Sequence, residues 1–265
     1  MNIFYRELKA NFKSLLIWIG FIIFFIYMGI SKYAAFTMAG SEVMEMMDSL
    51  PEAVLSAFQI NALNLTTLSG YYGVMFTYFA LMASIFAVLL GNGIIAKEER
   101  DKTVEFSLTL PIPRHKLITG KIAAALVNCL IFALAMWGFS LVFTLPYNPS
   151  QEFKEYLQIM MTSVLILELI FLAIGILLGA AMKEYKRSGS VAVSLLLGTY
   201  VLSILVELSE DLAFLKWVTP FKYFNPVSLL NDSKFQPEYL ALSAAIVVIC
   251  LGAAYFAYQK RDLYI

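Results

Sequence analysis

Long stretches without a charged residue restrict the possible folds of this chain more than any other feature. Residues 53–96 contain no charge, and shorter uncharged runs cover 14–31, 122–151, 188–206 and 239–259. A helix of about 20 residues rises about 1.5 Å per residue and crosses a hydrocarbon layer of about 30 Å. Each run can therefore hold a membrane-spanning helix, and a hydrophobic content of 60% agrees with a membrane protein.

A further span is predicted around the one isolated acidic residue, Glu168. Residues 157–182 include fourteen Leu, Ile, Val and Phe, which favour insertion by roughly 4 to 8 kcal/mol, whereas one mid-span charge costs roughly 3 kcal/mol. The balance favours insertion, so the sequence predicts an all-α integral membrane protein with six transmembrane helices. We place all residues, 1–265, in one transmembrane domain. The expected spans cover residues 14–36, 70–96, 114–145, 155–182, 188–207 and 238–259.

The distribution of basic residues predicts the orientation of this domain. An even number of spans places both termini on one side. Of the nineteen Lys and Arg, fourteen lie on the side of the termini. Because basic residues are enriched in cytoplasmic loops, we expect a multi-pass protein of a bacterial plasma membrane with both termini in the cytoplasm.

Segments outside the spans predict short surface helices. Phe4 and Leu8 share a face within residues 2–13, which predicts an N-terminal interfacial helix. Before the second span, "SLPEAVLSAF" predicts an extracellular amphipathic helix. Before the sixth span, residues 212–237 are rich in aromatic residues and interrupted by Pro. They predict an extracellular amphipathic or re-entrant helix with its aromatic side chains at the level of the lipid headgroups.

The connection between the second and third spans, residues 97–113, is dense in charge. Glu98 and Glu99 lie where a helix dipole favours acidic residues, and Pro111 is a helix stop. Val104 and Leu108 share a face. An amphipathic helix of this kind suits docking into a groove of another protein. A solvated hairpin packed against the ends of the spans is the alternative, and the spacing does not separate the two.

This connection resembles the signature of the ABC-2 family of ATP-binding-cassette transporter permeases. The family has an acidic pair, Gly-Thr, a Glu, an apolar pair, a Pro, an Arg, and a Gly-Lys that opens the third span. Lys102 stands where the family usually has Gly, and Ser107 where Leu is common. The stretches "LPEAVLSAFQI", "LSGYYG" and "TPFKYFNP" are also similar to the family. The matching positions are Glu98, Glu99, Thr103, Glu105, Leu108, Leu110, Pro111, Arg114, Gly120 and Lys121.

The resemblance implies a permease that exports amphipathic or lipophilic cargo, such as a peptide, an antibiotic or a lipid. Two ABC ATPase subunits, which bind ATP and Mg²⁺, are expected to dock on a coupling helix in the 97–113 connection. This chain has no G-x-x-x-x-G-K-[ST] phosphate loop, so we expect no cofactor and no enzymatic activity in it. The residues expected to couple the ATPase to the spans are Glu98, Glu99, Thr103, Glu105, Leu108, Pro111 and Arg114.

The resemblance also implies a second permease copy or a related permease, with the second and fifth spans lining a path between the two. Gly189 and Gly198 would permit close approach of the fifth span. Aromatic residues in a span are nevertheless more often packing or lipid-facing residues. The net charge is +0 and there is no separate basic domain, so no nucleic acid partner is expected. The possible path residues are Tyr72, Phe76, Phe79, Ser194 and Tyr200.

Glu168 leaves other classes of function open, because an ionisable group inside the membrane is a functional candidate by default. It could bind a cationic part of the cargo, carry a proton, or pair with a polar group in the bundle. A stand-alone secondary transporter or channel would use it as the coupling site, although such folds usually have repeated halves and broken helices. A regulatory membrane partner of an ATPase is the other alternative.

Overall fold

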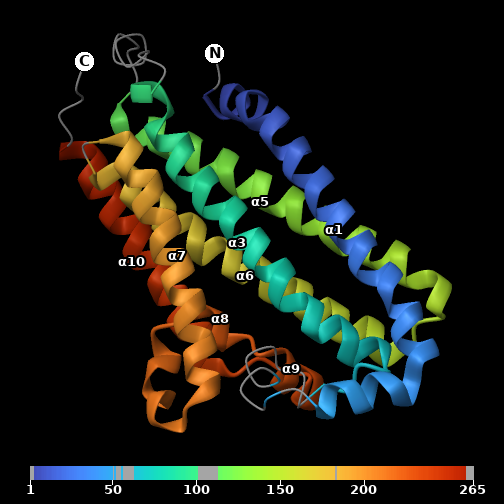
Figure 1. Ribbon diagram of the computed structural model, residues 1–265. Helices are drawn as coiled ribbons and strands as arrows, with labels where there is room; N and C mark the ends of the chain where they lie inside the picture. The colour runs from blue at the N-terminus through green and yellow to red at the C-terminus, as the bar shows by residue number, and fades with distance from the viewer. Residues whose placement is uncertain are drawn as a thin grey trace.

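Six long helices form the molecule within the described residues, which are 3–49, 51, 55, 63–100, 113–182 and 184–260 of a computed structural model (Figure 1). Each of the six is long and apolar enough to cross a membrane, which confirms the predicted all-α fold with six spans. They are α1 (Ile3–Asp48), α3 (Leu68–Arg100), α5 (Arg114–Thr144), α6 (Gln151–Ala181), α7 (Tyr185–Leu208) and α10 (Pro237–Lys260).

Both ends of the described chain lie at one end of the bundle. The start of α1 and the end of α10 are close to the N and C labels in Figure 1. We call this the terminal end. Within the described residues, the opposite end carries four short helices: η2 (Leu145–Tyr147), η3 (Glu210–Trp217), α8 (Pro220–Tyr223) and α9 (Pro226–Asp232).

The centre of the bundle is the pair α3 and α6, which make the most extensive contact between any two helices. α10 packs against α6, α7 packs against α3, and α1 packs against α5 on the other side. α3 is the most buried of the six spans and α10 the least. Large apolar side chains also cover the outer surface of the bundle. Examples are Phe21 on α1 and Ile249 on α10, which are 58% and 68% exposed. This outward apolar surface is typical of a protein that is surrounded by lipid.

Glycine lets the backbones of α3 and α6 touch. A Cβ atom on Gly91 would lie 2.4 Å from the carbonyl oxygen of Leu172, and one on Gly175 would lie 2.3 Å from that of Val88. No larger residue fits at either position without separating the helices, which is the role of small residues in membrane helix packing. Gly198 has no heavy atom of the described chain within 4 Å of its Cβ position, so close approach of another copy there stays a prediction.

The structure differs from the expected interfacial helix at the N-terminus. The N-terminal amphipathic segment is the first part of α1, and Phe4 and Leu8 pack against the core of the bundle. Its turns therefore continue into the span without a break. Before the sixth span the chain forms η3, α8 and α9, because Pro220 and Pro226 each begin a new helix. The helix expected before the second span falls almost entirely outside the described residues.

Candidate functional site

The predicted coupling segment joins the end of α3 to the start of α5 at the terminal end. Glu98 and Glu99 lie in the last turn of α3, which continues to Arg100, and Arg114 is the first residue of α5. The structure thus describes the two helices between which the segment is attached. The other predicted coupling residues lie outside the described part of the chain: Thr103, Glu105, Leu108 and Pro111.

Lys121 connects α5 to α3 near this segment. Its side chain is fully buried, and Nζ donates a hydrogen bond of 2.9 Å to the backbone carbonyl oxygen of Ile94. A buried ammonium group requires acceptors in place of its lost hydration, so this contact constrains the two helices relative to each other. Lys121 matches the Gly-Lys of the family motif, but its spacing indicated no particular role. A lysine at the start of a span usually serves only as a basic flank.

A second polar contact joins α3 to α7. The Nδ2 atom of Asn92 donates to Oγ of Ser188 at 3.0 Å, and Oγ of Ser188 donates to Oδ1 of Asn92 at 3.3 Å. Both side chains are buried. Each side chain therefore supplies a hydrogen-bond partner for the other, and the contact joins two helices that are distant in the sequence. Sequence reasoning missed this pair because single polar residues in apolar spans have no periodic pattern.

α5 is also joined to the last turns of α10. The Nη1 atom of Arg114 donates a 3.0 Å hydrogen bond to the carbonyl oxygen of Gln259, and the hydroxyl oxygens of Thr119 and Tyr255 are 2.8 Å apart. A cation beside the last carbonyl groups of a helix also complements the helix dipole. We call this set the terminal-end network, which brings together α3, α5, α7 and α10: Asn92, Ile94, Arg114, Thr119, Lys121, Ser188, Tyr255 and Gln259.

Glu168 is fully buried in α6, and neither of its carboxyl oxygens has a hydrogen-bond partner among the described residues. The structure therefore does not supply the polar partner that the pairing alternative requires. An ionised carboxylate without partner or counter-ion costs several kcal/mol in such surroundings, so the side chain fits its site as a neutral acid.

The predicted path residues fall into two groups. Tyr72, Phe76 and Phe79 on α3 are at most 2% exposed, and the hydroxyl of Tyr72 donates a 2.6 Å hydrogen bond to Oγ of Ser140 on α5. These three residues pack inside the chain. On α7, Ser194 is exposed and Tyr200 is half-buried against Phe221. The assignment of all five residues to a path stays a prediction.

The comparison with protein families adds an independent result. The family model described as ABC-2 family transporter protein matches residues 1–263, which is nearly the whole chain. The comparison with curated proteins found no match.

Proposed function

The chain belongs to the ABC-2 transporter family and is a membrane permease component of an ATP-binding-cassette transporter, and we propose that separate ATPase subunits drive it as an exporter. Two ATPase subunits, which bind ATP and Mg²⁺, dock on the segment between α3 and α5. A second copy of the chain or a related permease completes the transporter. The terminal end faces the cytoplasm of a bacterial cell, in accordance with the excess of basic residues on that side.

The observation that supports this proposal best is the terminal-end network. A force on the docking segment acts directly on α3 and α5, because the segment is covalently continuous with both. The Asn92–Ser188 contact then extends the movement to α7, and the Arg114–Gln259 contact extends it to α10. One docking site can therefore displace four of the six spans together.

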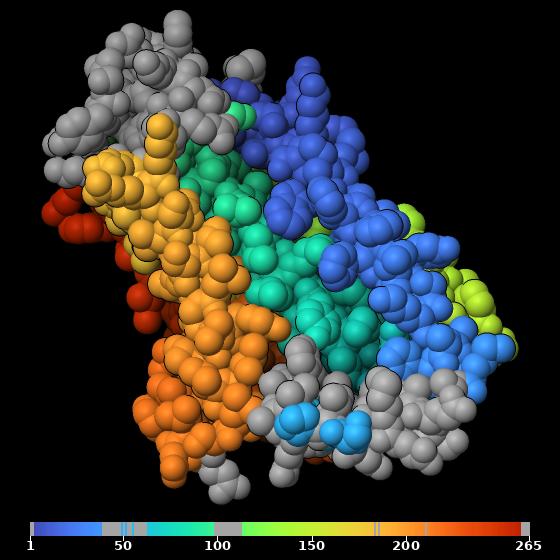
Figure 2. All heavy atoms as spheres, viewed as in Figure 1, coloured from blue at the N-terminus to red at the C-terminus, as the bar shows by residue number. Residues whose placement is uncertain are grey.

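The cargo is amphipathic or lipophilic, and it moves along the accessible side of α3 and α7. Figure 2 shows the surface of α3 between those of α1 and α7. Tyr78 and Met82 on this helix are half-buried and Leu89 is 38% exposed, and their spacing places them along one stripe. Ser194 contributes an exposed hydroxyl group on α7. This mixture of apolar and weakly polar groups suits a molecule that enters from the lipid phase.

Reversing the charge of Glu98 and Glu99 tests the docking assignment. The double substitution Glu98→Lys and Glu99→Lys is expected to uncouple hydrolysis of ATP from transport, or to release the ATPase during purification. Both are measured with the complex in lipid vesicles. The matched control reverses Glu152 and Glu155, two exposed acids in the first turns of α6 at the opposite end. Cargo-stimulated ATPase turnover at the level of the unmodified complex would contradict the assignment.

A further inference from the structure

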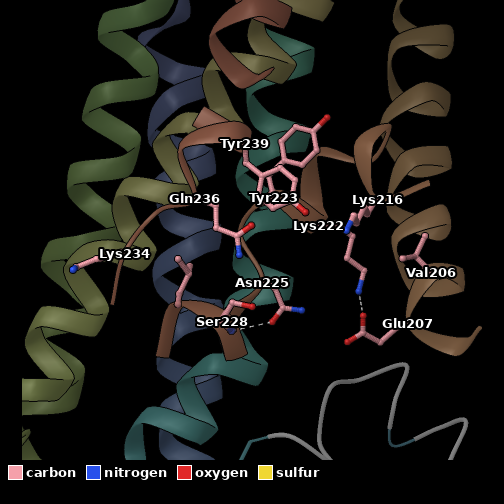
Figure 3. A pocket seen from close by; sticks show the side chains of 11 residues that line it. Val206, Glu207, Lys216, Lys222, Tyr223, Asn225, Ser228, Lys234, Gln236 and Tyr239 are labelled. Atoms are coloured by element: carbon pink, nitrogen blue, oxygen red, sulfur yellow. Dashed lines mark hydrogen bonds and ion pairs between the residues drawn. The ribbon is translucent and has the colours of Figure 1, made fainter. Parts of the chain in front are cut away.

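A cavity of about 220 Å³ lies at the opposite end of the bundle, away from the ATPase docking segment (Figure 3). Its walls come from the end of α7, from η3, α8 and α9, and from the start of α10. This volume is smaller than the roughly 300–1,000 Å³ of pockets that enclose whole drug-sized molecules. The cavity therefore suits one polar group of a larger ligand.

The charge around the cavity is predominantly positive. Three lysines and one acid line it: Lys216, Lys222, Lys234 and Glu207. The Nζ atom of Lys222 forms an ion pair with Oε2 of Glu207, and the Lys222 side chain is only 9% exposed. In Figure 3 the amine of Lys234 is directed away from the other lining groups. Lys216 and Lys222 are thus the cations available to a bound anion.

Asn225 adds a neutral donor to this cation pair. Its Oδ1 atom accepts from the backbone N–H groups of Val227 and Ser228, at 2.8 and 3.4 Å, and so begins α9. The amide oxygen is therefore engaged, and Figure 3 shows the amide nitrogen on the side of Lys222. A group that accepts hydrogen bonds and carries negative charge complements these donors.

The residues beside the cavity place it at the surface of the lipid layer. It lies where α7 ends and α10 begins, at the boundary of two spans. On the adjacent η3, Phe214 and Trp217 are 66% and 44% exposed, and Val218, which follows this helix, is 60% exposed. Exposed aromatic residues at the ends of spans are typical of the headgroup region. An anion that is attached to acyl chains would therefore meet cations and apolar surface together.

We propose that this cavity binds the phosphate group of an anionic phospholipid, with Lys216, Lys222 and the amide of Asn225 as donors. Glu207 competes with the phosphate for Lys222. Removing the charge of Glu207 therefore strengthens binding, whereas removing the charge of either lysine weakens it. This site is separate from ATPase docking and does not depend on it.

Titration calorimetry of the full chain in neutral detergent tests the proposal with three probes. These are dihexanoylphosphatidylglycerol, inorganic phosphate, and dihexanoylglycerol, which has no phosphate. We expect the phosphatidylglycerol to bind most tightly. Lys216→Gln and Lys222→Gln should each weaken its binding roughly tenfold, which corresponds to one charge-assisted hydrogen bond. Lys154→Gln is the matched control, because Lys154 is exposed at the same end on α6.

Glu207→Gln distinguishes a local effect from misfolding, because a damaged protein does not gain affinity. We expect a severalfold tighter Kd for phosphatidylglycerol in this variant when it is measured at acidic pH, where Lys222 stays charged without Glu207. Unchanged affinity in the lysine variants, or equal binding of dihexanoylglycerol, would overturn the proposal. Inorganic phosphate binding as tightly as phosphatidylglycerol would assign the cavity to a soluble anion and overturn the lipid assignment.

Discussion

The ammonium group of Lys121 reaches the backbone of Ile94 inside the terminal end, across 2.9 Å. The acceptor is a main-chain carbonyl group, so the contact positions α3 itself and does not depend on the side chain of Ile94. Lys121 follows the start of α5 by seven residues, and Ile94 precedes the end of α3 by six. The two attachment points of the docking segment are therefore joined by a direct contact between their helices.

Truncating Lys121 is expected to destabilise the protein. Lys121→Ala removes a buried donor and leaves a cavity, so we expect the free energy of unfolding to fall by about 2–4 kcal/mol. Denaturant unfolding in detergent measures this change. Lys116→Ala is the control, because Lys116 is exposed on the same helix and its loss should cost less than about 0.5 kcal/mol. Equal stability of the two variants would show that the buried contact contributes nothing net.

The contact between Asn92 and Ser188 predicts a measurable interaction energy. In a double-mutant cycle of Asn92→Ala and Ser188→Ala, the coupling should be about 0.5–1.5 kcal/mol, the range found for polar contacts between membrane helices. Unfolding in detergent supplies the four free energies. Strict additivity of the two substitutions would show that the hydrogen bonds do not hold α3 against α7.

Adding one methyl group between α3 and α6 should be severely disruptive. Gly175→Ala places a Cβ atom 2.3 Å from the carbonyl oxygen of Val88, so the helices must separate. We expect a loss of about 2 kcal/mol or more in stability. Gly93→Ala is the control within α3, where no heavy atom lies within 4 Å of the added Cβ atom. The control should be neutral or slightly stabilising because alanine favours a helix over glycine. Similar thermal unfolding of both variants would contradict the close contact.

Replacing Glu168 by an apolar residue is expected to stabilise the fold. Glu168→Met removes two buried oxygens that have no partner among the described residues, and should raise the free energy of unfolding by about 1–3 kcal/mol. Glu168→Gln keeps a neutral polar group and should leave export unchanged. Loss of export in a folded Glu168→Gln variant would instead favour the alternative in which this carboxyl group couples an ion to transport.

Binding of phosphatidylglycerol at the opposite end should weaken as the pH rises. Burial lowers the pKa of Lys222 to about 8, so the amine is charged below this pH and neutral above it. The Kd should therefore increase between pH 7 and 9, while the phosphodiester keeps its charge. Calorimetry with Lys222→Gln should show a flatter profile, and Lys216→Gln should retain the dependence. A flat profile in the unmodified protein would contradict this role of Lys222.

Other ionisable groups around the cavity bear on this pH profile. Burial raises the pKa of Tyr223 to about 12, which places its ionisation above the tested range. Among the described residues, the other ionisable groups that line the cavity are Glu207 on α7, Lys216 on η3, Lys234, whose amine is directed away, and Tyr239. Glu207 stabilises the charged form of Lys222, so Glu207→Gln should move the midpoint of the profile to lower pH.

The spans could be predicted from the sequence because insertion into lipid depends on local composition. Glu168 did not prevent the prediction of its span, since fourteen apolar residues surround it. Which helices lie at the centre could not be predicted in the same way. α3 and α10 are both apolar, yet one is the most buried span and the other the least. The distinction depends on close contacts such as that of Gly91, which only the folded chain creates.

The candidate site was predicted only in part for the same reason. The motif identified Arg114, because its spacing from the acidic pair is local in the sequence. It did not identify Asn92 and Ser188, which are 96 residues apart and meet only in the fold. The aromatic residues Phe76 and Phe79 have the composition of a ligand-binding face, but tertiary packing places them in the core.

The backbone contact at Gly91 and Gly175 limits how this transporter can move. Two helices whose main chains touch cannot slide or rotate against each other without breaking that contact. α3 and α6 therefore move as one rigid body. A displacement of α3 at the terminal end must then carry α6 with it, so that α6 follows the four spans that the terminal-end network joins. A covalent crosslink between α3 and α6 should therefore leave the transport cycle intact.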